Sequence, residues 1–361
     1  MIDENLSSYD SSAMIPLEAP IHVGWQCTNE CNLQCVHCYA SAGHRSLNEF
    51  DTKEAMKLIE SVADLSARSI VFTGGEPLMR KDLFELVEFA RDHHLFAIIA
   101  TNGTLIDRDI AKFFKKSGVA VAINLPTLDE RSSGIFTGVF NSHNARMRGL
   151  MYCLEERVPT SVGIAVTNLN LKEIGRVIDF SREKRINCDV LATIPVGRAS
   201  SSLLPPASEY EEMLGDILNR YSAIPMNAID RAGETNVSVY EPIYARIIKD
   251  RRKEEFPRLC SLGNAMHVME DGSVRSCVYM PTSFGNIRRK KLTTIWKEIR
   301  ESRILVKLRD PHRLKGACGK CEDREICGGC RARAYALTGD VFAEDIICTR
   351  CTMIDSENKS R

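Results

Sequence analysis

Three cysteines, Cys31, Cys35 and Cys38, stand close together near the start of the chain in the spacing CxxxCxxC. Thiolates at this density suit a soft metal centre. A tetrahedral zinc site needs a fourth ligand, whereas an iron–sulfur cluster can be held by three thiolates with one iron left open. The motif therefore favours a cluster that keeps one position free for another molecule.

A second motif, Gly74-Gly75-Glu76-Pro77, follows an apolar segment over residues 69–72 that is typical of a buried strand. Glycines leave backbone groups open to a ligand, and the Glu76 carboxylate can accept hydrogen bonds from an ammonium group. The alternative is a plain Gly-Gly turn with no ligand. The cysteine motif upstream favours the binding site.

A second cysteine array occupies the C-terminal third of the chain. It contains a CxxC pair, five residues, and another CxxC pair. Such pairs bind zinc as well as iron–sulfur clusters, although zinc sites usually have a longer loop between the pairs. The members of the array are Cys260, Cys277, Cys318, Cys321, Cys327, Cys330 and Cys348.

Together these motifs resemble the radical S-adenosylmethionine (radical SAM) family with a C-terminal SPASM extension. In that family three thiolates, here Cys31, Cys35 and Cys38, hold a [4Fe-4S] cluster, and S-adenosylmethionine chelates the fourth iron. Reductive cleavage then gives a 5′-deoxyadenosyl radical. The resemblance implies that the Gly74–Pro77 motif binds the amino group of S-adenosylmethionine. Other expected cofactor contacts are His37, packed against adenine, with Tyr39, Thr101, Asn102, Asn124 and Arg198.

The SPASM resemblance implies one or two auxiliary iron–sulfur clusters. One would be held by Cys318, Cys321, Cys327 and Cys348, and the other by Cys260, Cys277 and Cys330. The second set lacks a fourth cysteine because Ser261 stands where some relatives have one. A non-cysteine ligand, an open iron, Cys351 as a substitute, or absence of this cluster all remain open. Cys27, Cys153 and Cys188 fit no ligand spacing and are expected to be packing residues.

The elements that position these residues alternate between strand-like and helix-like segments from about residue 20 to 196. Strands are expected over residues 21–25, 69–72, 96–100, 119–125, 161–166 and 188–194, with helices between them. The motifs follow the strands directly, as in a parallel βα barrel. We expect an α/β fold: a partial (β/α)6 TIM-like barrel with a small C-terminal cluster-binding domain. The expected boundaries are an N-terminal arm (1–20), the barrel (21–205), a helical connector (206–255) and the SPASM domain (256–361).

Composition excludes several classes of protein. The 361 residues contain 48 Lys and Arg against 48 Asp and Glu, so no global basic field indicates a nucleic-acid partner. No apolar run approaches the ~20 residues of a membrane span, and the first residues lack the pattern of a signal peptide. Fourteen cysteines without an export signal favour metal binding in a reducing, cytoplasmic setting.

The string Cys327-Gly-Gly-Cys330-Arg-Ala-Arg-Ala-Tyr335 has a shorter cysteine spacing than is usual for SPASM domains. It resembles the branch that acts on tetrapyrroles in alternative haem and haem d1 biosynthesis. The resemblance implies oxidative decarboxylation of iron-coproporphyrin III propionates, or removal of acetates from didecarboxysirohaem, with a ferredoxin or flavodoxin as reductant. Candidate carboxylate anchors are Arg198, Arg331 and Arg333, and candidate iron ligands are His22, His44, His143 and His267.

Two other interpretations stay open. A maturase of a ribosomal peptide or of another cofactor would share most of these motifs, although the first ~20 residues look too short for a peptide-binding domain. A non-catalytic iron–sulfur or zinc scaffold would not need the Gly74–Pro77 motif.

Overall fold

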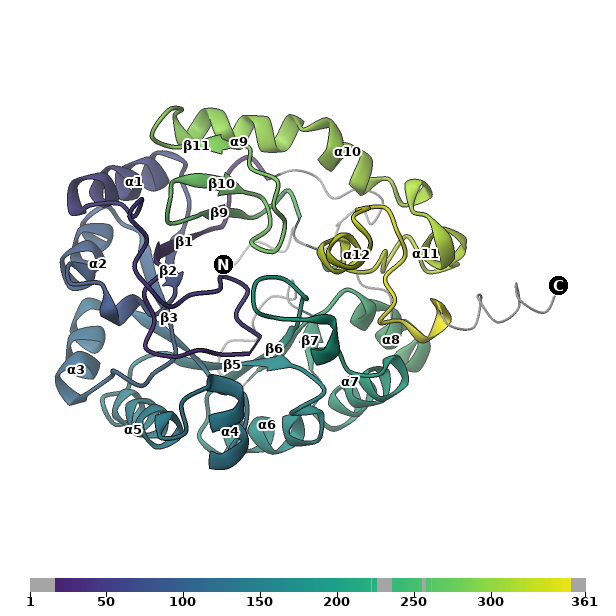
Figure 1. Cartoon of the computed structure of the whole chain (residues 1–361), viewed down its shortest axis with the longest axis horizontal. Coiled ribbons are helices and arrows are strands. Elements are labelled where there is room, and N and C mark those ends of the chain that lie inside the picture. The colour runs from purple at the N-terminus through teal and green to yellow at the C-terminus, as the bar shows by residue number, and fades with distance from the viewer. Residues whose placement is uncertain (1–16, 222, 226–235, 255–257, 261, 352–361) are drawn as a thin grey trace, which may run out of the picture.

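The computed structural model describes residues 17–221, 223–225, 236–254, 258–260 and 262–351. At its centre is a curved, open sheet whose six middle strands pair in parallel and in sequence order (Figure 1). This confirms the partial barrel that was expected from the sequence. The strands are β1 (His22–Thr28), β2 (Ser69–Gly74), β3 (Phe96–Thr101), β4 (Ala120–Asn124), β5 (Thr160–Val166) and β6 (Asn187–Ala192).

Helices cover the outer face of this sheet (Figure 1). The first begins at a capping box, in which Asp51 and Glu54 each accept a hydrogen bond from the other's backbone N–H. The apolar stripe that follows is buried against the sheet. The helices are α1 (Thr52–Asp64), α2 (Leu83–Asp92), α3 (Arg108–Ser117), α4 (Glu130–Thr137), α5 (Ser142–Glu155) and α6 (Ile174–Glu183), with 3-10 turns η1 (Pro77–Met79), η2 (Leu171–Glu173) and η3 (Ser201–Leu203).

The short helix α4 was not expected from the sequence. It begins at Asp129, whose side chain accepts from the backbone N–H of Ser132, and it ends at Gly138 in the left-handed region. It has only two turns, so its apolar pattern is too short to stand out.

The sheet extends beyond the expected six strands at both edges. On the β6 side, β8 (Val237–Tyr240) and β7 (Ile224–Pro225) add in parallel. The segment expected as a helical connector, 206–255, contains the helices α7 (Ala207–Tyr221) and α8 (Ile243–Arg252) and, in addition, these two strands. In β8, buried Val237 and Val239 alternate with half-buried neighbours, which is a strand pattern too short to recognise beside two helices.

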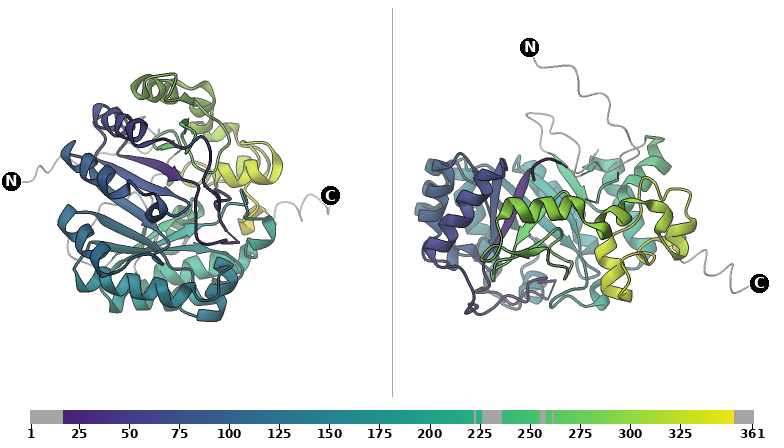
Figure 2. Two further views of the ribbon diagram at one scale, coloured as in Figure 1. Left: turned by 60° about the vertical axis from the view of Figure 1, so that its left-hand side comes forward. Right: turned by 90° about the horizontal axis from the view of Figure 1, so that it is seen from above.

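On the β1 side the sheet continues into the C-terminal region. Strand β9 (Met266–Val268) lies parallel to β1, and β10 (Ser273–Arg275) and β11 (Gly285–Asn286) follow in antiparallel order. The two halves of the chain thus share one sheet, and the C-terminal helices lie beside the open side of the barrel (Figure 2). These helices are α9 (Leu292–Glu301), α10 (Arg303–Arg309), α11 (Gly316–Lys320) and α12 (Arg331–Thr338), with the 3-10 turn η4 (Pro311–Arg313).

The hydrophobic core runs between the sheet and its helices and includes Cys27, Cys153 and Cys188, as expected for packing residues. Burial raises the pKa of each of these thiols to about 12, so they stay protonated. Within the ranges that the structure describes, no helix has the length and apolar character needed to cross a membrane. Most of the arm expected over residues 1–20, and Ser261, lie outside these ranges.

Candidate functional site

The carboxyl ends of β1 to β4 bring the expected N-terminal site residues to one edge of the barrel. The cysteine loop leaves β1 and closes at its base, where Cys31 N–H donates to Gly43 O (3.1 Å) and Gly43 N–H donates to Asn29 O (2.8 Å). The three cysteines lie half-buried on this one loop. Parallel strands place their carboxyl ends at the same edge, which explains the grouping.

The surroundings of the three thiols suit deprotonated ligands. The backbone N–H of Leu33 donates to Cys31 Sγ, and that of Ala42 donates to Cys38 Sγ, each at 3.4 Å. Burial raises the pKa of Cys35 to about 11, and the nearby Arg146 and Arg198 oppose that rise. Because iron would take the thiolate form, donors and cations here would favour binding. The donor set therefore fits a [4Fe-4S] cluster held by three cysteines.

Arg198 holds the cysteine loop in shape. Its Nε donates to Cys35 O (3.0 Å) and its Nη1 to Ala42 O (2.6 Å), while its backbone N–H donates to Cys38 O (2.9 Å). Two nitrogens of the guanidinium thus bind carbonyls of the loop, and contact of Arg198 with the cofactor or a substrate carboxylate stays a prediction.

Glu76 is likewise committed to the protein. Its carboxylate is fully buried and accepts from Leu78 N–H (3.1 Å), Thr101 Oγ1 (2.7 Å) and Asn102 N–H (2.7 Å). Burial raises the pKa of this carboxyl, and these hydrogen bonds oppose the rise. Glu76 therefore ties the end of β2 to the end of β3. A carboxylate has about four acceptor positions, so the protein itself fills three of them, and binding of the S-adenosylmethionine ammonium group by Glu76 stays a prediction.

The two glycines before Glu76 lie directly against the start of the cysteine loop. Gly75 N–H donates to Thr28 O (2.8 Å) and Glu76 N–H donates to Glu30 O (2.7 Å). A Cβ on Gly75 would overlap the Glu30 carbonyl oxygen, and Gly74 has φ +134°. The motif is thus a close backbone contact between two loops and not a free turn.

Replacing Gly75 with alanine is expected to push these loops apart, because a backbone carbonyl cannot move aside as a flexible side chain can. We expect Gly75→Ala to weaken S-adenosylmethionine binding at least tenfold (about 1.4 kcal/mol), measured by equilibrium dialysis of the reconstituted protein. Gly175→Ala, on the outer helix α6 with ordinary contacts at 3.5 Å, is the matched control. Equal binding by the two variants would contradict the close-contact interpretation.

Three further residues were expected to contact the cofactor: His37, Asn102 and Asn124. His37 packs edge-on against Phe136 (centroids 5.9 Å apart), its buried Nδ1 has no hydrogen-bond partner, and burial lowers its pKa to about 4. A neutral ring with a free nitrogen suits contact with adenine. Asn102 reaches the cysteine loop, since its Nδ2 donates to Asn32 Oδ1 (2.8 Å), and Asn124 lies half-buried at the end of β4.

Tyr39 connects the cysteine loop with the C-terminal region. Its ring meets Tyr279 edge-to-face, with centroids 5.6 Å apart. Tyr279 comes just after Cys277 and lies near both Cys277 and Cys330. The two tyrosines therefore stand between the N-terminal thiols and part of the second cysteine array.

One residue of this site, Arg146, was not identified from the sequence. It lies on α5 with 1% of its surface exposed, and it donates to Asn102 O through Nε (3.0 Å) and to Ser133 Oγ through Nη1 (3.0 Å). Its charge acts on both Cys35 and Glu76. The signal was an arginine on the otherwise buried stripe that includes Leu150 and Cys153. A buried cation at this edge suits a carboxylate such as that of S-adenosylmethionine.

Two neighbouring cavities lie at the C-terminal cysteines. One is lined by the four expected thiols of one cluster, Cys318, Cys321, Cys327 and Cys348, together with Cys351, and Cys260 lines the other. Cys351 interacts with Cys318 and Cys348, so it belongs beside this set and not beside Cys260. Cys260, Cys277 and Cys330 form the second group, in which Cys260 acts electrostatically on both others.

No three His, Cys, Asp or Glu side chains in the described part of the chain are placed to hold a metal ion. In a cluster, by contrast, each thiolate binds a different iron. The four thiols around the first cavity, Cys318, Cys321, Cys327 and Cys348, fit an arrangement of that second kind.

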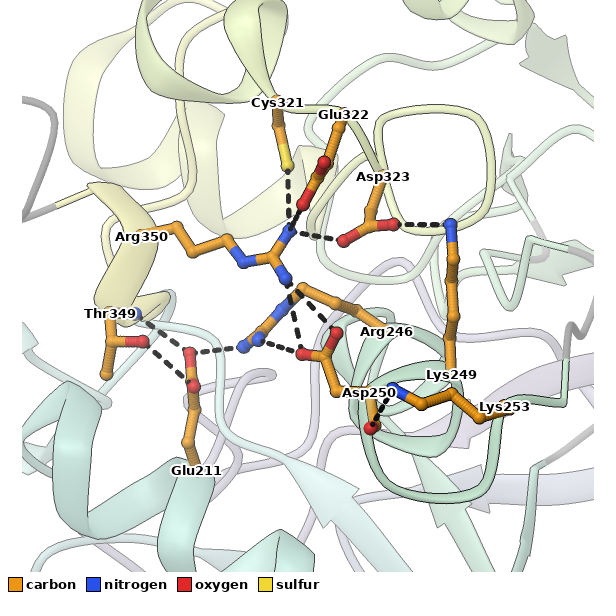
Figure 3. Close-up of polar contacts among 10 residues, drawn as sticks. All are labelled: Glu211, Arg246, Lys249, Asp250, Lys253, Cys321, Glu322, Asp323, Thr349 and Arg350. Atoms are coloured by element: carbon orange, nitrogen blue, oxygen red, sulfur yellow. Dashed lines mark hydrogen bonds and ion pairs between the residues drawn. The ribbon is translucent and has the colours of Figure 1, made fainter.

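Charged residues surround the first of these cavities (Figure 3). Arg350 donates through Nη1 to Cys321 Sγ (3.8 Å) and pairs with Asp250 and Asp323. Arg246, which lines the cavity, pairs with Glu211 and Asp250. Every arginine in this view thus has at least one carboxylate partner.

The two other arginines proposed as carboxylate anchors are also buried. Arg333 is 1% exposed and pairs with Glu241 (2.9 Å) and Asp345 (2.7 Å). Arg331 is 3% exposed and donates through Nη1 to the carbonyls of Val341 (3.0 Å) and Ala343 (2.6 Å). The expectation that Arg333 anchors a substrate carboxylate is therefore wrong, because its buried guanidinium already pairs with two carboxylates of the protein.

The four histidines considered as iron ligands do not form one cluster in the described structure. His22 binds Ser69 Oγ (2.6 Å) at the amino end of β1, away from the edge that carries the cysteine loop. His44 is exposed, and His143 is buried on α5. His267 lies on β9 with its ring against Gly24 of β1, and burial lowers its pKa to about 4.

Comparison with known proteins agrees with this site. The Radical SAM superfamily profile matches residues 25–181, and the SPASM iron–sulfur cluster-binding domain matches residues 260–322. The chain is 32% identical over 346 residues to the AdoMet-dependent heme synthase of Nitratidesulfovibrio vulgaris, covering 91% of each chain. It is 32% identical over 348 residues to the Fe-coproporphyrin III synthase of Methanosarcina barkeri, covering 90% of this chain and 87% of that one.

Among solved structures, Streptococcus suis SuiB bound to precursor peptide SuiA has a similar fold, with a TM-score of 0.72 at 18% identity. The match covers 93% of this chain and 76% of SuiB. The motifs, the fold and the full-length relatives agree: the chain belongs to the radical SAM superfamily, in the group with a C-terminal SPASM domain.

Proposed function

We propose that this protein is a radical SAM enzyme that modifies the side chains of an iron-tetrapyrrole in haem biosynthesis. The observation that carries the proposal is the 32% identity to a heme synthase over 91% of both chains, which includes barrel and C-terminal domain alike. Two reactions are in view: oxidative decarboxylation of iron-coproporphyrin III propionates, and removal of acetate groups from didecarboxysirohaem.

The residues at the barrel edge divide the work of such an enzyme. Cys31, Cys35 and Cys38 would hold the [4Fe-4S] cluster, which with S-adenosylmethionine supplies a 5′-deoxyadenosyl radical when bound. Arg198 keeps their loop in shape through the carbonyls of Cys35 and Ala42. Arg146 would bind the carboxylate of S-adenosylmethionine.

Cluster reduction needs a low-potential electron donor, and we propose a ferredoxin or flavodoxin in the cytoplasm. Conversion of one propionate to a vinyl group also releases an electron. Loss of a β-hydrogen atom leaves a carbon radical, and loss of CO₂ and one electron then forms the double bond. The C-terminal cysteines would hold the auxiliary clusters that receive it. Cys318, Cys321, Cys327 and Cys348 would bind one, and Cys260, Cys277 and Cys330 the other.

The second candidate is a maturase of a ribosomal peptide. It is favoured by the fold shared with SuiB bound to its precursor peptide, at 18% identity. The heme synthase relative is more similar and matches a larger share of its own length, 91% against 76%.

An anaerobic assay with reconstituted protein, S-adenosylmethionine and dithionite tests the proposal. Iron-coproporphyrin III and didecarboxysirohaem are supplied separately, and products are followed by mass spectrometry. Loss of CO₂ and hydrogen from the first, or of acetate from the second, identifies the reaction. Formation of 5′-deoxyadenosine with both tetrapyrroles unchanged would instead favour the peptide maturase.

A further inference from the structure

A second set of arginines lies at the C-terminal cysteines, and it differs from the set in Figure 3 because none of its members forms an ion pair with a carboxylate of the described residues. Arg258, Arg309 and Arg331 line a small cavity together with Cys260 and Gly329. The rest of the described lining is leucine, with no acidic residue. The three guanidinium groups therefore surround the cavity beside Cys260 with positive charge.

In the part of the chain that the structure describes, the hydrogen bonds of these arginines leave that charge uncompensated. Arg258 donates to the carbonyls of Leu308 (3.2 Å) and Arg309 (3.4 Å). The Nε and Nη2 atoms of Arg309 and of Arg331 are buried and have no hydrogen-bond partner among the described residues. Burying an unpaired polar group costs about 1–3 kcal/mol, and more for a charged one. Such groups indicate that an anion belongs beside them.

Further charges near this cavity do not cancel the imbalance. Burial lowers the pKa of Arg258, and the charge of Arg331 lowers it further. Cys260 and Glu325 oppose this shift. Glu325 itself pairs with His312 and Arg324. On the Cys330 side, Asp345 interacts electrostatically with Arg331, but Asp345 and Glu241 both form their ion pairs with Arg333.

The loop Cys327-Gly328-Gly329-Cys330 contributes to both cavities, and Arg258 and Arg331 lie close to its glycines. A Cβ on Gly328 would overlap the Arg258 guanidinium, and one on Gly329 would come within 2.9 Å of Arg331 Nη2. Both glycines also have positive φ, +65° and +63°. The paired glycines thus let two cations approach the backbone between Cys327, which lines the first cavity, and Cys330.

We propose that Arg258, Arg309 and Arg331 raise the reduction potential of the cluster held by Cys260, Cys277 and Cys330 above that of the cluster held by Cys318, Cys321, Cys327 and Cys348. Positive charge near a cluster favours its reduced, more negative form. At the first cavity, carboxylates such as Asp323 and Asp250 offset the cations. The cluster at Cys260 thereby becomes the first acceptor of the electron that leaves the substrate.

This inference rests on the proposed function for the source of that electron. In each decarboxylation, one electron enters to cleave S-adenosylmethionine to methionine and the 5′-deoxyadenosyl radical. The radical takes one hydrogen atom, and the substrate loses CO₂ and one electron, which passes to the cluster at Cys260. The electrons that enter and leave are therefore equal in number.

The test is an anaerobic redox titration of the full-length holoprotein, followed by electron paramagnetic resonance, in a background in which Cys31, Cys35 and Cys38 are alanine. Arg309→Gln removes the positive charge of a side chain whose Nε and Nη2 have no hydrogen-bond partner among the described residues. Arg309→Lys keeps the charge, and Arg303→Gln, exposed on the same helix α10, is the matched control. Cys277→Ser identifies which signal belongs to the second group.

We expect two auxiliary signals, with the one lost in Cys277→Ser having the higher potential. Arg309→Gln should lower that potential and leave the other signal in place, Arg309→Lys should restore most of the shift, and Arg303→Gln should change nothing. An unshifted potential in Arg309→Gln, or the same shift in Arg309→Lys, would overturn the proposal. No substrate is present, so this result is independent of whether a tetrapyrrole is turned over.

Discussion

Replacing Arg333 with methionine is expected to destabilise the folded protein by about 3–5 kcal/mol, because two carboxylates would be left buried without a cation. Glu241 and Asp345 are 1% and 0% exposed, and each lies within 2.9 Å of the guanidinium. Asp345 also accepts from Cys330 N–H (2.7 Å). The loss should therefore extend to the second cysteine group, with reduced iron content after reconstitution.

The measurement is anaerobic unfolding by denaturant, compared with Arg313→Met. Arg313 pairs with Asp310 at the surface, where the side chains are 53% and 42% exposed, and such pairs contribute at most about 1 kcal/mol. The double variant Arg333→Met/Glu241→Gln should recover part of the loss because it removes one unpaired charge. A loss in Arg333→Met no larger than that in Arg313→Met would contradict the role given to the buried ion pairs.

The interaction of Asp345 with Arg333 makes the stability of the wild-type protein depend on pH. Burial alone would raise the pKa of Asp345, but Arg333 lowers it below its ordinary value in the folded state. A carboxyl with a lowered folded pKa stabilises the protein above its unfolded pKa of about 3.9. That contribution is lost as the pH falls through the folded pKa. Acid unfolding should consequently begin at a higher pH in a variant that lacks this interaction, such as Asp345→Asn.

Replacing Cys31, Cys35 and Cys38 together with alanine is expected to abolish S-adenosylmethionine cleavage. Iron content after reconstitution should fall by about four atoms per chain, the content of one [4Fe-4S] cluster. The iron at the C-terminal cysteines should stay, because none of those thiols belongs to the N-terminal loop and five of them line a separate cavity. Iron analysis and chromatography of 5′-deoxyadenosine check both effects.

Cys153→Ala is the matched control, since Cys153 is fully buried in the core between α5 and the sheet. It should keep its iron and its 5′-deoxyadenosine production, with only the small stability loss of a core truncation. Full cleavage activity in the triple alanine variant would refute the assignment of the radical SAM cluster to this loop.

The barrel and the place of its site were predictable because both depend on local pattern. Apolar strands end directly before the motifs, and α1 begins at the capping box of Asp51 and Glu54, two residues only three positions apart. What the sequence could not provide were partners distant along the chain. Arg198 donates a hydrogen bond to the carbonyl of Cys35, and Arg333 donates to the carboxylate of Glu241. Strand β9 joins β1 across more than two hundred residues, which no local pattern encodes.

Isotope transfer from the tetrapyrrole tests the central claim most directly. Iron-coproporphyrin III carrying deuterium at the β-carbons of its propionates would be incubated anaerobically with the reconstituted enzyme, S-adenosylmethionine and dithionite. We expect 5′-deoxyadenosine that contains deuterium from these positions, formed together with vinyl products and CO₂. Unlabelled 5′-deoxyadenosine beside unchanged tetrapyrrole would contradict hydrogen abstraction from these side chains.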